Sequence, residues 1–166
     1  MKELVVLGLG SNLGDSCYIL REAVASLSLV LTDIKCSSIY KTRPRDFEDQ
    51  SDFFNAVVIG YYSNSPESLL SILQEIECSF GRQREFELRF GPRTLDIDIE
   101  FFGSTVIRSK NLEIPHVRMY ERQFVLVPLL ELLPFAADPV TGQLLSEIAS
   151  FLPDQGVKKV GTIYGI

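Results

Sequence analysis

The segment "TLDIDIEFF" (residues 94–102) decides the fold, because its polar and apolar residues alternate. The polar residues are Thr94, Asp96, Asp98 and Glu100, and the apolar ones are Leu95, Ile97, Ile99 and Phe101. This period of two predicts a β-strand with one polar and one apolar face. Asp96 and Asp98 then point the same way. They are either part of a solvated strand face or a pair of metal-binding carboxylates.

Working outward from this strand, five earlier elements can be read from hydrophobic patterns. Residues 4–10 are apolar on both faces, which is typical of a central, covered strand. Helical spacing appears at 15–30 and 65–81, and strand-forming residues dominate 33–41 and 53–62. We expect Asp15 to lie near the first helix N-terminus. Ser65 and Pro66 would begin the second helix and Gly81 would end it.

The resulting order, β-α-β-β-α-β, is the ferredoxin-like pattern, so we predict an α+β fold with a mainly antiparallel sheet. Its first two helices should cover one face. Further helices near 121–133 and 144–152 should cover the other face, which extends the core to a three-layer α-β-α sandwich. We assign no element after residue 153. The length of 166 residues predicts a single domain over 1–166.

Composition narrows the function classes. The net charge of −6 argues against nucleic acid or an anionic membrane as the main partner. The three cysteines have no paired spacing, which is typical of free thiols in a reducing compartment. The apolar start is too short to span a membrane. We therefore expect a cytoplasmic protein.

Two long loops and a glycine-rich turn are candidate functional segments. The loops are 42–52 and 81–92, and loops of this length in compact domains are often functional. The turn "GLGSNLG" (8–14) is neither a dinucleotide fingerprint, since Leu13 stands where a third glycine is needed, nor a P-loop. Taken alone, it indicates a tight turn into a helix.

Arginines near the aspartates favour a phosphate-handling site over a solvated strand. Arg82, Arg84, Arg89 and Arg93 precede Asp96 in a chain that is acidic overall. Guanidinium groups match phosphate oxygens, and paired carboxylates suit Mg²⁺ that also binds substrate phosphates. The alternative is a solvated loop whose arginines pair with nearby glutamates.

Two other groups could bind substrate. Phe53 and Asn55 would share one strand face, and a ring beside an amide suits a flat heterocycle. The alternative is that Phe53 packs in the core and Asn55 forms a turn at the strand end. His116 is the only histidine, and it could contact phosphate or be structural.

Together these motifs resemble the hydroxymethyl-dihydropterin pyrophosphokinase family of folate synthesis. The segments that match are 8–15, 53–58, 90–103 and 114–132. The resemblance implies transfer of the pyrophosphoryl group of ATP to the hydroxymethyl oxygen of the reduced pterin, with two Mg²⁺ ions and release of AMP. It implies small-molecule substrates only, and we expect a monomer.

The resemblance also implies roles for single residues. Asp96 and Asp98 would hold both metals, and Arg82 and Arg93 would act in catalysis beside them. The pterin would be bound by Thr42, Phe53, Asn55 and Phe124, with the two rings on its opposite faces. The ATP site would be lined by Gln74, Glu77, Arg84, Ile99, Leu112, His116 and Arg122. This sequence departs from the family pattern at five positions, and these departures bear on loop closure and ATP affinity but not on the reaction. The positions are Arg43, Arg45, Phe90, Asn111 and Val117.

Two rival functions stay open at this point. A nucleotidyl transferase or cyclase could use two strand aspartates on the same kind of sheet, and it would release pyrophosphate instead of AMP. A ligand-binding module without catalysis would show no Mg²⁺ dependence and no turnover.

Overall fold

The computed structural model describes residues 1–44, 50–82 and 91–165. The strands of its main sheet are β1 (Glu3–Ser11), β2 (Thr32–Cys36), β3 (Ile39–Thr42), β4 (Phe53–Tyr62), β5 (Asp96–Phe102) and β8 (Lys158–Gly161). The helices are α1 (Ser16–Leu27), α2 (Pro66–Ser79), α3 (Gln123–Leu132) and α4 (Leu145–Ser150). A small hairpin, β6 (Ile107–Arg108) with β7 (Glu113–Ile114), and a 3-10 turn (Met119–Glu121) lead from β5 into α3.

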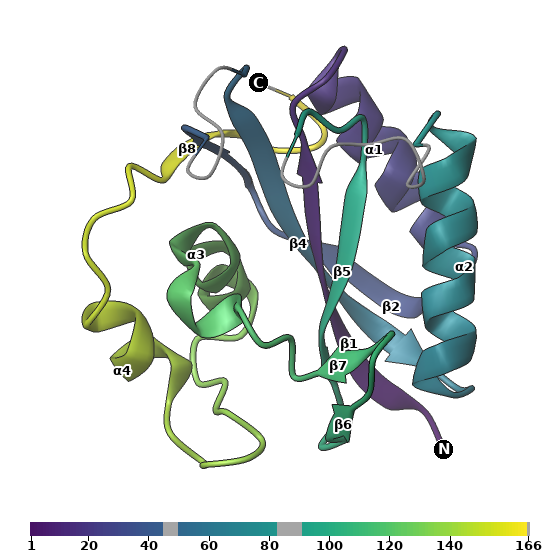
Figure 1. Cartoon of the computed structure of the whole chain (residues 1–166), viewed down its shortest axis with the longest axis vertical. Helices are drawn as coiled ribbons and strands as arrows, with labels where there is room; N and C mark the ends of the chain where they lie inside the picture. Colours follow the sequence, from purple (N-terminus) through teal and green to yellow (C-terminus); the bar gives the residue numbers. More distant parts are fainter. Residues whose placement is uncertain (45–49, 83–90, 166) are drawn as a thin grey trace.

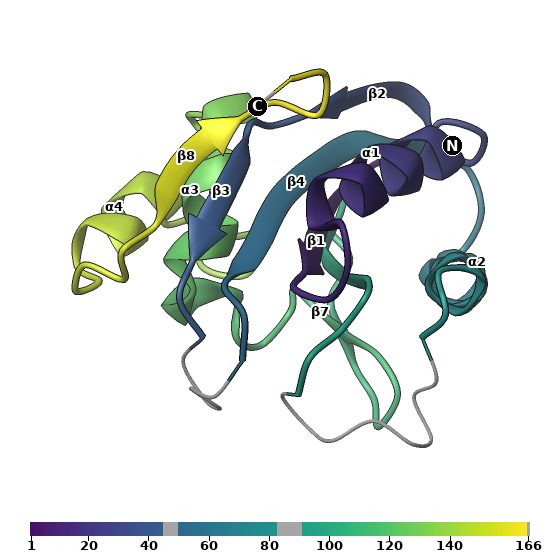
Figure 2. The same ribbon diagram turned by 90° about the horizontal axis from the view of Figure 1, so that it is seen from above.

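The main sheet has the predicted topology. Its order is β5-β1-β4-β3-β8, β2 pairs with another part of β4, and every pair is antiparallel. If β2 and β3 are counted as one interrupted strand, this is the strand order of the ferredoxin-like fold. Figure 1 shows α1 and α2 on one face of the sheet and α3 and α4 on the other, and Figure 2 shows the same three layers from above. The predicted three-layer sandwich is confirmed.

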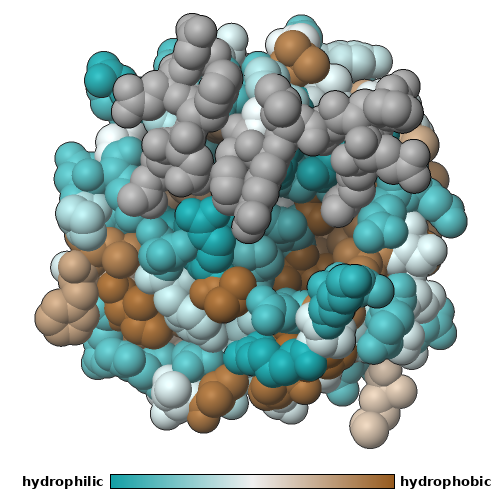
Figure 3. Space-filling model, in the orientation of Figure 1, coloured by the Kyte–Doolittle hydropathy of each residue, from teal (hydrophilic) through white to brown (hydrophobic). Residues whose placement is uncertain are grey.

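The apolar character of β1 has a simple cause: both of its faces are covered. Val5, Leu7 and Leu9 are at most 2% exposed and belong to the core beneath α1 and α2. Val6 belongs to the second core, beneath α3. On the outer surface seen in Figure 3, hydrophilic residues are interspersed with smaller apolar areas.

The helix boundaries follow the expected capping chemistry. Asp15 accepts a hydrogen bond from the Tyr18 N–H at 3.0 Å, and Ser65 accepts one from the Ser68 N–H at 3.2 Å. Gly81 follows α2 with φ of +86°, a conformation that favours glycine. Within the described ranges, no helix has both the length and the apolar character needed to cross a membrane.

The prediction of one strand over 33–41 is wrong, because Ser37 and Ser38 interrupt it. Ser37 Oγ accepts a hydrogen bond from the Val57 N–H at 2.9 Å, so a side chain takes a place in the ladder that a backbone carbonyl would normally fill. The Ser38 N–H and hydroxyl both donate to Glu131 of α3. The strand therefore breaks into β2 and β3.

The contacts of Glu131 also fix the position of α3 over the sheet. Its second carboxylate oxygen accepts a hydrogen bond from the Tyr40 hydroxyl of β3 at 2.6 Å. The unpredicted strand β8 pairs with β3 on the outer side. The end of α3 is thereby tied to β3, and the helix packs against β3 and β4.

Candidate active site

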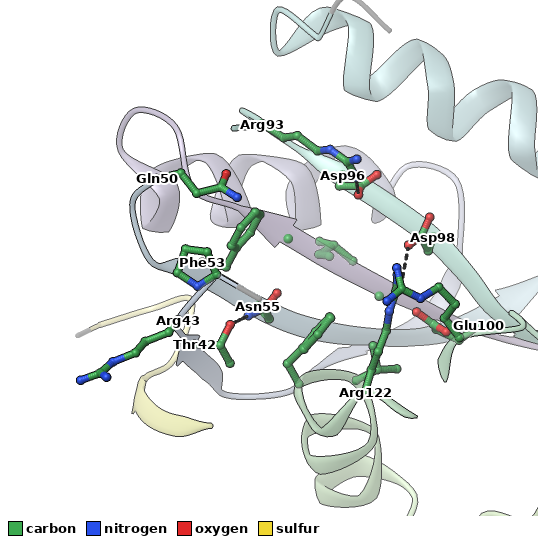
Figure 4. A pocket seen from close by; sticks show the side chains of 17 residues that line it. Thr42, Arg43, Gln50, Phe53, Asn55, Arg93, Asp96, Asp98, Glu100 and Arg122 are labelled. Atoms are coloured by element: carbon green, nitrogen blue, oxygen red, sulfur yellow. Dashed lines mark hydrogen bonds and ion pairs between the residues drawn. The ribbon is translucent and has the colours of Figure 1, made fainter. Parts of the chain in front are cut away.

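A pocket lies on the α3 side of the sheet, where β1 presents glycines in place of side chains (Figure 4). Gly8 and Gly10 form part of its floor. The four residues predicted for the pterin all line it: Thr42, Phe53, Asn55 and Phe124. Arg93, Asp96, Asp98 and Arg122 line it as well. Residues from five separate segments of the chain thus meet at one site.

Asn55 is held in a fixed orientation at the pocket wall. It is 5% exposed, and its Nδ2 donates to Thr42 Oγ1 at 3.0 Å and to the Tyr40 carbonyl at 3.5 Å. A Cβ at position 10 would lie 3.4 Å from Asn55 Oδ1, so Gly10 keeps the space beside the amide open. A buried amide oriented in this way can read the polar edge of a ligand.

Asp96 is held as a carboxylate by two arginines. Arg82 Nη1 lies 2.5 Å from its Oδ1, and Arg93 Nη1 pairs with its Oδ2. Burial alone would raise the pKa of Asp96, but the charges of Arg93 and Arg82 outweigh burial and hold it below the ordinary value.

Arg82 is itself fixed by a buried partner. Its side chain is 7% exposed and forms an ion pair with Glu77 of α2, which is 1% exposed. Glu77 also accepts a hydrogen bond from the Ile97 N–H at 2.8 Å. The network therefore ties α2, Arg82 and β5 together and sets the direction of Asp96.

Asp98 lies in a different electrostatic environment. Burial, followed by the charge of Asp96, raises its pKa to about 7. It forms an ion pair with Arg122, whose Nη1 lies 3.7 Å from Asp98 Oδ2, the contact marked by a dashed line in Figure 4. The Asp98 side chain remains 36% exposed. The pKa values of two carboxyl groups on one strand face are thus shifted in opposite directions. The pKa of Asp96 is lowered by two arginines, whereas that of Asp98 is raised.

His116 faces Asp98 as a neutral imidazole. Its Nδ1 accepts a hydrogen bond from the Arg118 N–H at 3.2 Å, which assigns the proton to Nε2. That Nε2 lies 3.9 Å from Asp98 Oδ2. Burial and the charge of Arg122 lower the pKa of His116 to about 4, so the ring is a neutral hydrogen-bond donor near neutral pH.

A second pocket lies on the other side of Asp98. Four of the residues predicted for ATP line it: Gln74, Ile99, Leu112 and His116. Lys110 and Asn111 line it too. Arg122 lies in the first pocket, Glu77 is buried beneath Arg82 and lines neither pocket, and Arg84 is outside the described residues.

Asn12 is a site-organising residue that the sequence reasoning did not identify. Its Oδ1 accepts a hydrogen bond from the Arg93 N–H at 2.8 Å, and its Nδ2 donates to Gln50 Oε1 at 2.9 Å and to the Ser51 carbonyl at 3.1 Å. It joins the glycine-rich turn to the ends of both long loops. The predicted tight turn was the available signal, but spacing alone does not show what the amide contacts.

The donor set fits a hard divalent cation. Asp96 and Asp98 offer carboxylate oxygens, which Mg²⁺ prefers, and no group of three or more His, Cys, Asp or Glu side chains gathers at metal-binding geometry in the described part of the chain. Mg²⁺ usually keeps several waters and takes its other ligands from substrate phosphates. Two protein carboxylates are therefore a sufficient set.

The fold and the site fit an enzyme class: transferases of phosphoryl-type groups. Comparisons with known proteins specify the family. The profile described as 7,8-dihydro-6-hydroxymethylpterin-pyrophosphokinase matches residues 6–134. The chain belongs to this family, as its sequence predicted.

Similar proteins include single enzymes and longer bifunctional ones. The chain is 46% identical over 134 residues to the 2-amino-4-hydroxy-6-hydroxymethyldihydropteridine pyrophosphokinase of Bacillus subtilis, covering 80% of this chain and 79% of that relative. It is 39% identical to the folic acid synthesis protein fol1 of Pneumocystis carinii, covering 95% of this chain but 21% of the relative. The crystal structure of wild-type Plasmodium falciparum HPPK-DHPS has the same fold, with a TM-score of 0.71, 18% identity and coverage of 90% of this chain and 44% of that one.

Proposed function

We propose that the two pockets hold the two substrates of one reaction and that Asp98 stands where they meet. The enzyme transfers the pyrophosphoryl group of ATP to the hydroxymethyl group of 6-hydroxymethyl-7,8-dihydropterin in folate synthesis. The hydroxymethyl oxygen bonds to the β-phosphorus, and the bond from that phosphorus to the oxygen bridging to the α-phosphate breaks. AMP leaves with the bridging oxygen, and the hydroxyl proton passes to solvent.

The observation that carries this division is that Asp98 lines both pockets. The first pocket combines the aromatic Phe53 and Phe124 with the fixed amide of Asn55, which suits a pterin ring. The second combines Gln74 and His116 with apolar residues, which suits a nucleotide. The atoms that react would then lie beside Asp98.

We propose that Asp96 and Asp98 hold two Mg²⁺ ions at this junction. When bound, the ions neutralise phosphate charge and align the acceptor oxygen. Arg82 and Glu77 act through Asp96 by fixing its direction. Three further side chains are placed to donate to phosphate oxygens. One is Arg93, whose side chain is 22% exposed, and the others are Arg122 and His116 near Asp98.

The direct test supplies ATP, Mg²⁺ and 6-hydroxymethyl-7,8-dihydropterin and measures AMP. We expect AMP in step with the pterin diphosphate, and neither without Mg²⁺ or without the pterin. Pyrophosphate in place of AMP would mean nucleotidyl transfer. Ligand binding with no turnover would mean a binding module. Asp98→Asn is the matched inactive variant, and Asp154→Asn, an exposed change far along the chain, is the control.

We also propose that the chain acts as a monomer in the cytoplasm. Cys17, Cys36 and Cys78 are free, which suits a reducing compartment. The net charge of −6 gives no support to nucleic acid or a membrane as a partner. Light scattering of the purified chain measures the oligomeric state, and a mass of about twice 18.7 kDa would contradict the monomer.

A further inference from the structure

A third carboxyl group follows the two aspartates on the same side of the sheet. In the β1–β5 register, Leu7 pairs with Ile99 and Val6 pairs with Phe101, so Glu100 is an extra residue in a β-bulge. Phe101 joins the apolar core beneath α3, and Glu100 lines the first pocket beside Asp98. Bulges commonly redirect a side chain next to an active site. Figure 4 shows Glu100 reaching into the pocket below Asp98.

One oxygen of the buried Glu100 carboxyl has no hydrogen-bond partner among the described residues. The residue is 1% exposed, and Oε2 receives no hydrogen bond from the described residues. His116 Nδ1 lies 4.0 Å from Oε2, but that nitrogen already accepts the Arg118 N–H and carries no proton to donate. Burying an acceptor without a donor costs free energy, so an unpaired carboxyl oxygen at this place points to a missing donor.

The pocket floor is shaped around this carboxyl. A Cβ at position 8 would lie 2.6 Å from Glu100 Oε1, so the group occupies the space that Gly8 leaves free. The carboxyl is thus enclosed by the pocket floor, and its unpaired Oε2 can accept a hydrogen bond from a donor that arrives in the pocket.

We infer that Glu100 is a positioning residue for the metal site proposed above, and that its carboxylate accepts hydrogen bonds from water bound to the ion held by Asp98. The inference rests on that proposed metal site. Glu100 lies two residues after Asp98 in β5. In the described part of the chain, no group of three or more His, Cys, Asp or Glu side chains gathers at metal-binding geometry, so we assign Glu100 to a water on the ion and not to the ion itself. Mg²⁺ keeps such waters, and outer carboxylates orient them.

The test measures metal affinity rather than turnover. Mn²⁺ replaces Mg²⁺, α,β-methylene-ATP supplies a triphosphate that cannot react, and bound Mn²⁺ is counted by electron paramagnetic resonance. Glu100→Gln keeps the size of the side chain and removes its charge. We expect about 10-fold weaker Mn²⁺ binding, the lower end of the range for outer-shell ligands. The metal-free variant should melt no lower than wild type, and its pterin affinity should be unchanged. Glu147→Gln, on the exposed face of α4, is the control and should change none of these values.

A second variant tests the same inference without removing the charge. Gly8→Ala should push the carboxyl aside and weaken Mn²⁺ binding to a similar degree, and it should have no further effect in a Glu100→Ala background. Unchanged Mn²⁺ affinity in Glu100→Gln or Gly8→Ala overturns the inference, as does an equal loss of pterin affinity. Asp98→Asn separates the two proposals. If it abolishes Mn²⁺ binding while Glu100→Gln leaves the Mn²⁺ affinity unchanged, the metal site stands and the role of Glu100 falls. If neither variant changes binding, the metal site itself is wrong.

Discussion

Replacing Asp98 by asparagine should stabilise the metal-free protein at pH 8 while it destroys the metal site. The pKa of Asp98 is raised from 3.8 to about 7, chiefly by burial and then by Asp96. A difference of about three pH units at about 1.4 kcal/mol each sets an upper limit of about 4 kcal/mol on the cost of ionising this group. Since the side chain is 36% exposed, solvent screening reduces the expected gain to about 2 kcal/mol.

The sign of the pH dependence follows from proton binding. Between about pH 4 and pH 7 the folded state holds the Asp98 proton more firmly than the unfolded state does. The contribution of this group to stability therefore falls as the pH rises through that window and is constant above it. Asp98→Asn removes the titration, so it should match wild type near pH 4 and exceed it by about 2 kcal/mol at pH 8.

Urea unfolding in EDTA at pH 4.5 and pH 8 measures this difference. Asp154→Asn is the matched control, because residue 154 is exposed and the asparagine keeps an oxygen acceptor for the Gly156 N–H. Adding Mg²⁺ with α,β-methylene-ATP should reverse the order, since only wild type gains stability from the bound metal. A metal-free Asp98→Asn protein that is less stable than wild type at pH 8, or a difference that does not grow with pH, would refute the reasoning.

Three further predictions concern residues around this centre. Glu77→Gln should lower the free energy of unfolding by about 3 kcal/mol, because it leaves the buried Arg82 with less counter-charge. Urea unfolding measures this loss, and the exposed Glu75→Gln is the control, which should leave stability unchanged. Asn55→Ala should weaken pterin binding by about 1–3 kcal/mol with nucleotide binding unchanged, as calorimetric titration of each ligand would show, and equal losses for both would contradict the two-pocket division. Asn12→Asp keeps the acceptor for the Arg93 N–H but loses the donor to Gln50 and Ser51. It should therefore slow AMP formation less than Asn12→Ala does. The reverse order would count against the role of the Asn12–Arg93 hydrogen bond.

Most of the fold could be predicted because local patterns and burial agree. The apolar run 4–10 became β1, which is covered on both faces, and the cap residues of α2 fall where they were expected. The strand over 33–41 could not be placed correctly, because its break depends on the Ser38 contacts with Glu131, 93 residues later in the chain. The short strand β8 has little apolar signal and exists through pairing with β3.

In the site, too, local sequence patterns predicted some residues, whereas others depend on tertiary contacts. Alternation was enough to place Asp96 and Asp98 on one strand face, and spacing placed Phe53 and Asn55 together. The bulge at Glu100 is not visible in that pattern, because strict alternation predicts Glu100 and Phe101 on opposite faces. The resemblance assigned Glu77 to ATP, and the structure buries it under Arg82, an arrangement that only the packing of α2 on β5 reveals.

The distribution of charge explains why Asp98 depends more than Asp96 on the cations that we propose for this site. Arg82 and Arg93 both pair with Asp96, and Arg82 also neutralises Glu77. At the other end, Asp98 forms an ion pair with Arg122, and Asp98 and Glu100 both lie near the neutral His116. Burial and then the charge of Asp96 raise the pKa of Asp98, although the charges of Arg122 and Arg93 oppose that rise. At the proposed metal site, a divalent ion that arrives with ATP would supply positive charge beside Asp98, and nucleotide binding would then complete the catalytic centre.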